Sequence, residues 1–407
     1  MQKKTILPFA ILCMVPFIMV LGNSMLIPLL PTMKARMNLT LFEVGLIITA
    51  FSIPAGIVIP FAGYLSDQFG RKIIIAPALV LYGAGGLIAG AAALLMTQPY
   101  MGIMVGRVVQ GIGAGGTYQL AMALTGDIFQ SNERAKALGL LEAANGLGKV
   151  ISPISGAALG LIIWFTPFFA YGLLAIPIAL AVWFLVKEPH MEQKNNNHGS
   201  EYFKKLKSIF KEKGVALLSS FLAGSVVLFI LFGTLSYLSD LLEQQYNIRG
   251  FATGLLIAIP VASMAVTSYI SGIILQKKIG NILKYTILGG LIIISASMGL
   301  IAFVTNIYFL FGALIAMGIG TGAVLPATNT LITSAAAASE RGVITCLYGS
   351  TRFFGVAMGP PAFGFVTEIG KLPLFIAASG LAIAATAAAF LLIKAKVLLP
   401  PKLLQES

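Results

Sequence analysis

The sequence predicts an all-α membrane protein in which twelve transmembrane helices form two pseudo-symmetric six-helix bundles. Of its 407 residues, 58% are hydrophobic and only 10% are charged, whereas roughly 25% of a soluble domain is charged. A surface with so little charge needs lipid as its solvent. The chain also contains twelve long apolar runs, and its two halves share short motifs at a nearly constant offset.

Each apolar run is long enough to cross a bilayer as a helix. A spanning helix takes roughly 20 residues, because the hydrocarbon core is about 30 Å thick, and a helix satisfies every backbone group within that core. The alternating polarity of a transmembrane β-barrel is absent. We expect spans at residues 7–30, 41–65, 73–96, 99–126, 135–163, 165–187, 214–243, 251–275, 282–303, 306–335, 341–368 and 372–395.

The basic residues set the expected orientation. If both termini are cytoplasmic, the external loops hold four of the 27 Lys and Arg residues, three lie deep inside spans, and the remaining 20 lie in cytoplasmic segments or at the cytoplasmic ends of spans. This asymmetry follows the positive-inside rule. We therefore expect a multi-pass protein of a bacterial plasma membrane, and we attribute its net charge of +13 to the loops rather than to nucleic-acid binding. The external bases are Lys34, Arg36, Arg249 and Lys371.

One long polar segment separates the two halves. We expect an N-terminal bundle at 1–187, a cytoplasmic linker at 188–213 and a C-terminal bundle at 214–407. In the second part of the linker, apolar residues recur at helical spacing between lysines, which predicts an amphipathic helix on the inner membrane surface. A flexible linker is the alternative. The apolar residues are Tyr202, Phe203, Leu206, Ile209 and Phe210.

The halves repeat one another. The pair Glu133-Arg134 recurs as Glu340-Arg341, an offset of 207 residues. At the same offset Gly148 matches Gly355, and Pro153 matches Pro360. Matches in the same order and at one offset predict two parallel six-helix repeats related by an axis along the membrane normal.

A ten-residue segment between the second and third spans carries a specific motif. It reads Gly63-Tyr64-Leu65-Ser66-Asp67-Gln68-Phe69-Gly70-Arg71-Lys72. Gly70 permits a tight turn and Gly63 permits close helix packing. The segment resembles the motif that marks the major facilitator superfamily, and the resemblance covers the whole chain. It implies a transporter with the fold of that superfamily.

The fourth span resembles the second motif of the drug:proton antiporter branch of this superfamily. The matching segment begins Arg107-Val108-Val109-Gln110-Gly111, and an arginine at this depth usually faces a cavity or a partner. A purely structural arginine, bonded to carbonyl oxygens, is the alternative. The resemblance further implies that Asp67, Arg71 and Asp127 form an ion-pair latch, which holds the outward-open state and breaks on inward opening.

The fifth span carries a stripe of polar and small residues. The stripe contains Glu142, Asn145, Lys149, Ser152 and Gly156 at helical spacing. It resembles the antiporter motif of exporters, although Ser152-Pro153 stands where that motif has Gly-Pro. The residues expected to pack helices closely are Gly63, Gly70, Gly111, Gly148, Pro153, Gly156, Gly359 and Pro360.

Glu142 is the expected proton carrier, with Asp240 as the second candidate. Burial favours the neutral form of a carboxylate and a nearby base favours the charged form; this balance suits a group that must bind and release protons. A static interaction of Glu142 with Lys149 is the alternative. The residues expected at a substrate cavity are Asn23, Arg107, Gln110, Asn145, Lys149 and Arg352.

These features predict a proton-coupled exporter of amphipathic small molecules that works by alternating access. The bases expected in the cavity would attract anions, so we expect anionic, zwitterionic or neutral polar substrates in preference to lipophilic cations. The alternatives are a dedicated exporter of an anionic metabolite, such as a siderophore or a peptide-like product, and an uptake symporter. A receptor is an alternative of a different class, which we disfavour because a receptor would usually add a substantial soluble domain.

We expect neither an enzyme nor a cofactor. Both histidines, His190 and His198, lie in the central linker, and no nucleophile–base pair or set of metal ligands is visible. The two cysteines, Cys13 and Cys346, lie in separate apolar runs and predict neither a disulfide nor a zinc site. We expect the partners to be a small-molecule substrate, protons and lipid, and the protein to be monomeric.

Overall fold

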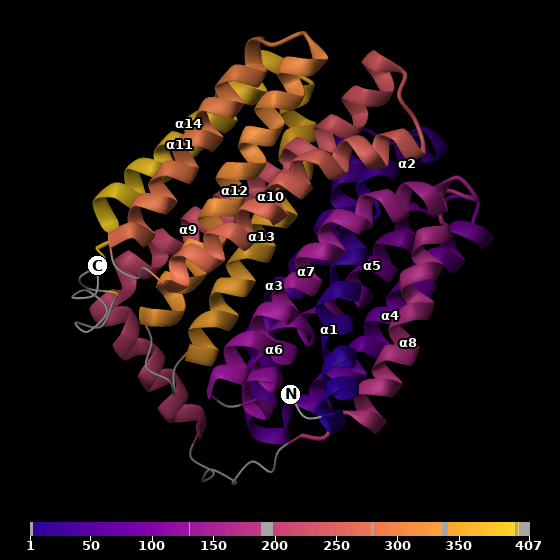
Figure 1. Ribbon diagram of the computed structural model, residues 1–407. Coiled ribbons are helices and arrows are strands. Elements are labelled where there is room, and N and C mark those ends of the chain that lie inside the picture. The colour runs from indigo at the N-terminus through magenta and orange to yellow at the C-terminus, as the bar shows by residue number, and fades with distance from the viewer. Residues whose placement is uncertain are drawn as a thin grey trace. The chain divides into compact units, whose positions relative to one another are not determined.

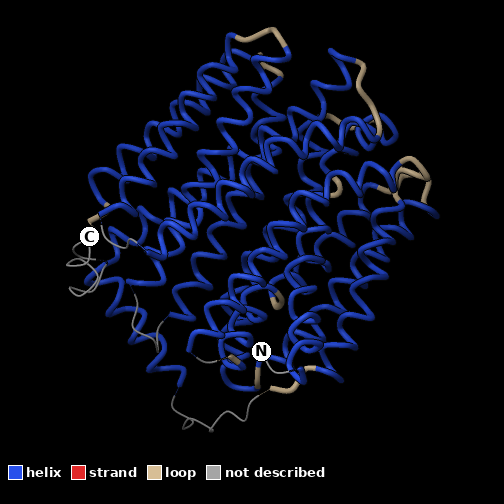
Figure 2. Tube along the Cα trace, viewed as in Figure 1, coloured by secondary structure: helices blue, strands red, loops and turns tan. Residues whose placement is uncertain are grey.

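The regular elements of this computed structural model are all helices in the part of the chain that it describes, residues 3–129, 131–188, 198–277, 281–335, 341–394 and 398 (Figures 1 and 2). Short connections join the helices within each described range. Fourteen α-helices occur among these residues, and they make twelve spans because the first and fourth spans are each divided into two α-helices. The predicted fold class is confirmed.

The first six spans occupy residues 3–185. Thr40 begins the second span as the N-cap of a capping box, in which its hydroxyl accepts from the Glu43 N–H and its own N–H donates to the Glu43 carboxylate. The elements are α1 (Lys3–Ser24), η1 (Ile27–Leu29), α2 (Leu30–Met37), α3 (Leu41–Phe69), α4 (Arg71–Leu95), α5 (Tyr100–Gly115), α6 (Tyr118–Ile128), α7 (Ser131–Gly160) and α8 (Thr166–Leu185).

The last six spans are unbroken helices. They are α9 (His198–Tyr246), α10 (Phe251–Lys277), α11 (Asn281–Phe303), α12 (Ile307–Ala335), α13 (Arg341–Thr367) and α14 (Lys371–Leu392). The segment expected to form a separate amphipathic helix is helical from His198 and continues without a break into the seventh span. Residues 189–197 of the expected linker lie outside the described residues.

The first span ends its α-helix early because prolines follow. Pro28 has no N–H to donate to the carbonyl of Ser24, which is the last residue of α1. A short 3₁₀-helix then leads into α2, which ends at Asn38 in the left-handed conformation with φ 52°. The span expected at 7–30 is therefore longer and interrupted.

The fourth span is also interrupted, whereas the sequence predicted one helix at 99–126. The break lies at Gly116 and Thr117, between α5 and α6. Glycine is a poor interior helix residue, and the Thr117 hydroxyl donates to the Ala114 carbonyl at 2.7 Å, where it competes with the helix hydrogen bonds. The break fixes where α6 begins and so positions Tyr118.

Helix contacts repeat between the two halves of the chain. In the first half, α4 packs against α5 and α8, which belong to the third, fourth and sixth spans. In the second half, α11 packs against α12 and α14, the ninth, tenth and twelfth spans. These are equivalent triplets, as the 207-residue sequence repeat predicts.

Nine stretches within the described residues are long and apolar enough to cross a membrane. The three remaining spans are α5 with α6, α7 and α13, and they carry the charged residues that the sequence placed inside the membrane: Arg107, Glu142 with Lys149, and Arg352. Intramembrane charge is expensive and usually functional. The three spans outside the nine thus carry candidate residues, and the fourth is among them because its break leaves helices of only 16 and 11 residues.

The chain forms two compact units. Unit 1 comprises Met1–Met191, Gly233–Ala258 and Pro360–Gly364, and unit 2 comprises Glu192–Phe232, Ile259–Gly359 and Phe365–Ser407. Parts of α9, α10 and α13 thus belong to the same compact unit as the first six spans. The division into 1–187, 188–213 and 214–407 stays a prediction.

Candidate functional site

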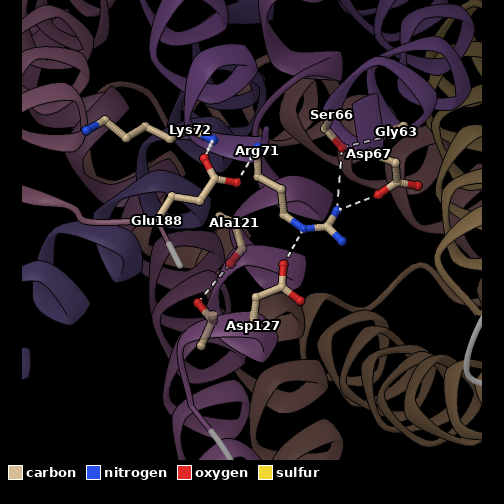
Figure 3. Close-up of polar contacts among 9 residues, drawn as sticks. Gly63, Ser66, Asp67, Arg71, Lys72, Ala121, Asp127 and Glu188 are labelled. Atoms are coloured by element: carbon tan, nitrogen blue, oxygen red, sulfur yellow. Dashed lines mark hydrogen bonds and ion pairs between the residues drawn. The ribbon is translucent and has the colours of Figure 1, made fainter. Parts of the chain in front are cut away.

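An ionic cluster forms at the turn between α3 and α4, within unit 1. The Arg71 Nε lies 2.5 Å from Asp127 Oδ2, and Arg71 Nη1 lies 3.2 Å from Asp67 Oδ1. Figure 3 shows the guanidinium reaching between the two carboxylates, one from the last turn of α3 and one from the last turn of α6. The structure therefore brings together the three residues predicted to form a latch. Their role in the transport cycle stays a prediction.

A third carboxylate supports this turn. Gly70 adopts φ 101°, a conformation that favours glycine, but a glycine has no side chain to cap the following helix. Glu188, just after α8, supplies the cap: its two oxygens accept from the N–H groups of Arg71 at 2.6 Å and Lys72 at 3.1 Å (Figure 3). A carboxylate at a helix N-terminus satisfies free N–H groups and complements the helix dipole.

The intramembrane Arg107 is fully buried in a polar network of unit 1. Its guanidinium donates to the carbonyls of Gly22 at 2.5 Å and Ile47 at 3.1 Å. It also donates to the Gln110 side chain at 2.7 Å and to the Asn23 side chain at 2.8 Å. The guanidinium lies over the Phe51 ring, 4.5 Å from its centroid.

All four of these acceptors are neutral oxygens, and two of them, the Gly22 carbonyl and the Asn23 side chain, lie in the last turn of α1. A cation is favourable at the C-terminal end of a helix, where carbonyl groups lack helical partners. This placement supports the alternative for Arg107, an arginine bonded to carbonyl oxygens. A substrate contact for Arg107, Gln110 or Asn23, all of them buried, stays a prediction.

Tyr82 of α4 extends this network to the backbone of α1. Its hydroxyl donates to the Ile18 carbonyl at 2.7 Å and accepts from the Gly22 N–H at 2.9 Å. A side chain at Gly22 would overlap the Tyr82 hydroxyl. Tyr82 could not be singled out from the sequence, because a tyrosine in an apolar run is usually a packing residue.

The expected proton carrier, Glu142, has a hydrogen-bond partner that was not predicted from the sequence. The Tyr118 hydroxyl, at the start of α6, donates a hydrogen bond to the Glu142 carboxylate of α7. Tyr118 is buried and Glu142 is exposed. The contact exists because the fourth span breaks just before Tyr118. The signal for the break was the Gly115-Gly116 pair.

The other expected site residues lie in different surroundings. Asn145 is buried on α7, whereas Lys149 on the same helix is half-buried. Arg352, in unit 2, lies over the Tyr348 ring at 5.5 Å from its centroid. Asp240 accepts a hydrogen bond from Lys34 at 2.8 Å.

Several residues expected at helix contacts lie where backbones approach closely. A Cβ on Gly111 would overlap the Phe51 carbonyl of α3, and a Cβ on Gly156 would overlap the Met25 carbonyl after α1. Gly148 faces Phe17 of α1, where an added Cβ would lie 3.1 Å from the carbonyl oxygen.

The prolines of these motifs contact glycines of other helices in unit 1. A Cβ on Gly254 of α10 would lie 2.6 Å from the Pro153 carbonyl oxygen, and one on Gly45 of α3 would lie 2.9 Å from the Pro360 carbonyl carbon. Gly359 is buried and Gly63 is half-buried. The Gly63 carbonyl accepts from the Ser66 hydroxyl at 2.8 Å. No group of three possible metal-binding side chains occurs among the described residues.

Comparisons with known proteins agree on the family. The sequence profile of the Major Facilitator Superfamily matches residues 12–360 and 284–405. The Bacillibactin exporter of Bacillus subtilis (strain 168) is 42% identical over 364 residues, which cover 89% of this chain and 90% of the relative. Multidrug efflux protein YfmO of the same strain is 28% identical over 374 residues, covering 90% and 87%.

Solved structures match the fold. A bacterial homologue of the human lysosomal transporter Spinster, in an inward-facing and unoccupied conformation, superposes with a TM-score of 0.76 at 17% identity, covering 98% of this chain and 100% of that chain. The human organic anion transporter MFSD10 superposes with a TM-score of 0.73 at 18% identity, covering 96% and 100%. At these identities the similarity concerns the fold alone.

Proposed function

Because the chain belongs to the major facilitator superfamily, we propose that it is a proton-driven exporter of small molecules that works by alternating access. The observation that carries this proposal is the 42% identity to an exporter over nearly the full length of both chains. The efflux protein at 28% identity supports the same direction of transport. We place both termini in the cytoplasm, because 20 of the 27 basic residues then lie on that side.

Glu142 is the proton carrier in this proposal, and Tyr118 positions it. Glu142 is a carboxylate within a span, and its hydrogen bond to Tyr118 ties it to α6, the helix that also supplies Asp127 to the Arg71 cluster. Gain and loss of a proton at Glu142 changes that hydrogen bond, since an ionised carboxylate only accepts whereas a protonated one also donates. A proton can therefore alter the contact between α6 and α7.

The test is transport in proteoliposomes with an acidic lumen and a neutral exterior. An antiporter accumulates substrate in the acidic lumen, whereas a proton symporter accumulates it only when the gradient is reversed. Glu142→Gln should abolish gradient-driven accumulation but retain exchange of labelled substrate, because the substrate site remains while coupling is lost. Tyr118→Phe should reduce accumulation by less than Glu142→Gln.

Glu133→Gln is the matched control, because Glu133 is an exposed carboxylate near the start of the same helix. Its accumulation should equal that of the wild type. Undiminished proton-driven accumulation by Glu142→Gln would exclude Glu142 as the carrier and make Asp240 the next candidate. Accumulation only under the reversed gradient would replace export with uptake.

We infer that the substrate is an anionic siderophore of the bacillibactin kind, and we keep a wider range of amphipathic molecules as the second candidate. The relative at 42% identity is a bacillibactin exporter, and the expected site carries a half-buried base, Lys149, on the same helix as Glu142. A half-buried ammonium favours an anionic group more strongly than an exposed one does, because water screens it less.

Binding to matched ligands that differ in charge tests this substrate class. Lys149→Ala should weaken binding of bacillibactin by about tenfold, the loss of one charge-assisted contact, and binding of an uncharged analogue by less than about twofold. Lys149→Arg should retain binding of the anion. Tight binding of lipophilic cations that Lys149→Ala leaves unchanged would favour a multidrug exporter instead.

A further inference from the structure

An ion pair at the other end of α3 joins two segments of unit 1 that are far apart in the sequence. Lys34 of α2 and Asp240 of α9 are separated by 206 residues, and Lys34 Nζ lies 2.8 Å from Asp240 Oδ1. We propose that this pair is a proton-sensitive gate on the external side, in which a proton and the Lys34 ammonium compete for the Asp240 carboxylate. This inference rests on the proton coupling and orientation proposed above.

The geometry holds both oxygens of the carboxylate. Asp240 Oδ1 accepts from Lys34, and Asp240 Oδ2 accepts from the Gln244 side chain one turn later in α9, at 2.8 Å. The Asp240 side chain is only 12% exposed and the Lys34 side chain 25%. Water screens such a pair less than it screens a surface pair, so loss of the charge on Asp240 has a direct effect on the contact between α2 and α9.

The backbone presents Lys34 in a fixed place. Lys34 lies in the last turn of α2, and its carbonyl accepts from the N–H groups of both Asn38 and Leu39. Asn38, in the left-handed conformation, ends the helix there. A lysine in the last turn of a helix is also favoured by the helix dipole. The cation is therefore positioned by local structure before it meets α9.

Charged and titratable groups also lie beside Asp240 along the chain, on α9 and just after it. Tyr237 lies one turn earlier and interacts electrostatically with Asp240. Glu243 lies almost one turn later, and its carboxylate is paired with Arg249, with Nε 3.1 Å from Oε1. Lys34 faces Asp240 from α2. A change in the charge of Asp240 therefore acts first on the contact with α2.

The location suits a gate that faces the external solution. Lys34 lies four residues before the Asn38 cap that precedes α3, whereas the Arg71 cluster lies at the far end of α3. A helix of 29 residues is about 43 Å long at about 1.5 Å per residue. In the proposed orientation, the Lys34–Asp240 pair faces the acidic side from which protons enter. Protonation of Asp240 removes the charge that holds Lys34 and lets α9 separate from α2.

The experiment measures the separation of α2 and α9 directly as a function of pH. Cys13→Ser and Cys346→Ala remove the two native cysteines. Ala35→Cys and Gln245→Cys then provide attachment sites for spin labels at exposed positions beside the Lys34–Asp240 pair. Double electron–electron resonance in lipid nanodiscs then gives the distance between the labels. In the wild-type background, the population at longer distance should increase as the pH falls from neutral to acidic.

Substitutions separate the gate from a structural contact. Asp240→Asn should shift the ratio of long to short distances by about fivefold at neutral pH and remove its pH dependence, and Lys34→Met should do the same. The double exchange of Lys34→Asp with Asp240→Lys should restore the short distance at neutral pH. Glu243→Gln is the matched control, because it breaks a neighbouring ion pair on the same helix and should leave both distance and pH response unchanged.

The outcomes distinguish this inference from the proposed function. Wild-type distances and pH response in both Asp240→Asn and Lys34→Met would overturn the gate, even if proton-driven transport by the wild type is intact. A pH-dependent distance that both variants abolish would support the gate, even if proteoliposomes show no proton-driven transport and the proposed function fails. If one of the two variants does not fold, the other gives the same test.

Discussion

The ionic sites that lie toward the two ends of α3 are built differently. At one end Arg71 is shared by Asp67 and Asp127, and all three residues come from the first four spans. At the other end Lys34 pairs with Asp240 across 206 residues of sequence. Both sites are intact in the same structure, so the first does not have to break when the second forms.

The difference lies in redundancy and exposure. Arg71 keeps one carboxylate partner when the other is neutralised, and the two partners are 52% and 36% exposed. Asp240 is 12% exposed, and Lys34 is the cation with which it pairs. A shared cluster keeps one ion pair when one carboxylate is neutralised, whereas a less exposed pair loses its attraction altogether. The first arrangement suits a latch and the second suits a switch.

The two carboxylates of the Arg71 cluster should differ in importance. Asp127 lies closer to the guanidinium than Asp67 does, 2.5 Å against 3.2 Å, and is less exposed. Asp127→Asn should lower the transport rate by about tenfold, as expected for the loss of a charge-assisted hydrogen bond. Asp67→Asn should lower it by about three- to fivefold, since exposed ion pairs contribute up to about 1 kcal/mol. Initial rates in proteoliposomes at matched protein content give the comparison.

The same variants sharpen the contrast with the gate. Asp67→Asn and Asp127→Asn should leave the pH dependence of the Ala35–Gln245 label distance unchanged, because both residues pair with Arg71 at the end of α3 that is remote from α2. Lys72→Gln is the control, since the Lys72 ammonium lies over the Trp183 ring rather than in the cluster. Normal transport by well-expressed Asp67→Asn and Asp127→Asn proteins would remove the latch from the mechanism.

A site could be predicted from the sequence when its residues lie close together along the chain or belong to one motif. The Arg71 cluster was predictable because Asp67, Gly70 and Arg71 lie within five residues and resemble a family motif, and Asp127 was the acid at the end of a recognisable span. The Lys34–Asp240 pair was not predicted, although Lys34 was assigned to an external loop and Asp240 to the outer end of a span. Hydropathy gives the depth of a residue in the membrane but not which helix lies beside it.

The buried residues also could not be interpreted fully without knowing which helices lie beside them. The sequence located Arg107 inside a span and left two interpretations open, and the structure provides the acceptors that favour the structural one. The bond between Tyr118 and Glu142 required knowledge that the fourth span breaks at Gly116 and Thr117. Twelve spans followed from hydropathy because each span is an independent property of about 20 residues. Interruptions depend on particular glycines and prolines whose effect the surrounding helices decide.

The smallest effect should come from Glu188, which supports the Arg71 cluster through the backbone. Its carboxylate accepts from the N–H groups of Arg71 and Lys72. Glu188→Ala removes both hydrogen bonds and the favourable charge at the start of α4, and should destabilise the protein by about 1 kcal/mol. Glu188→Gln keeps an acceptor oxygen but loses the charge, and should cost about 0.5 kcal/mol.

Thermal unfolding in detergent should therefore rank wild type above Glu188→Gln and Glu188→Gln above Glu188→Ala. Lys187→Gln is the control, because Lys187 is the exposed neighbour and its loss should not change the unfolding temperature. Transport by Glu188→Gln should fall by less than about twofold, because the ion pairs of Arg71 remain. If Glu188→Gln reduced transport as strongly as Asp127→Asn without lowering the unfolding temperature, Glu188 would belong to the latch itself. The contrast between the two sites would then change, because the cluster would depend on each of three acids around one arginine and would not be redundant.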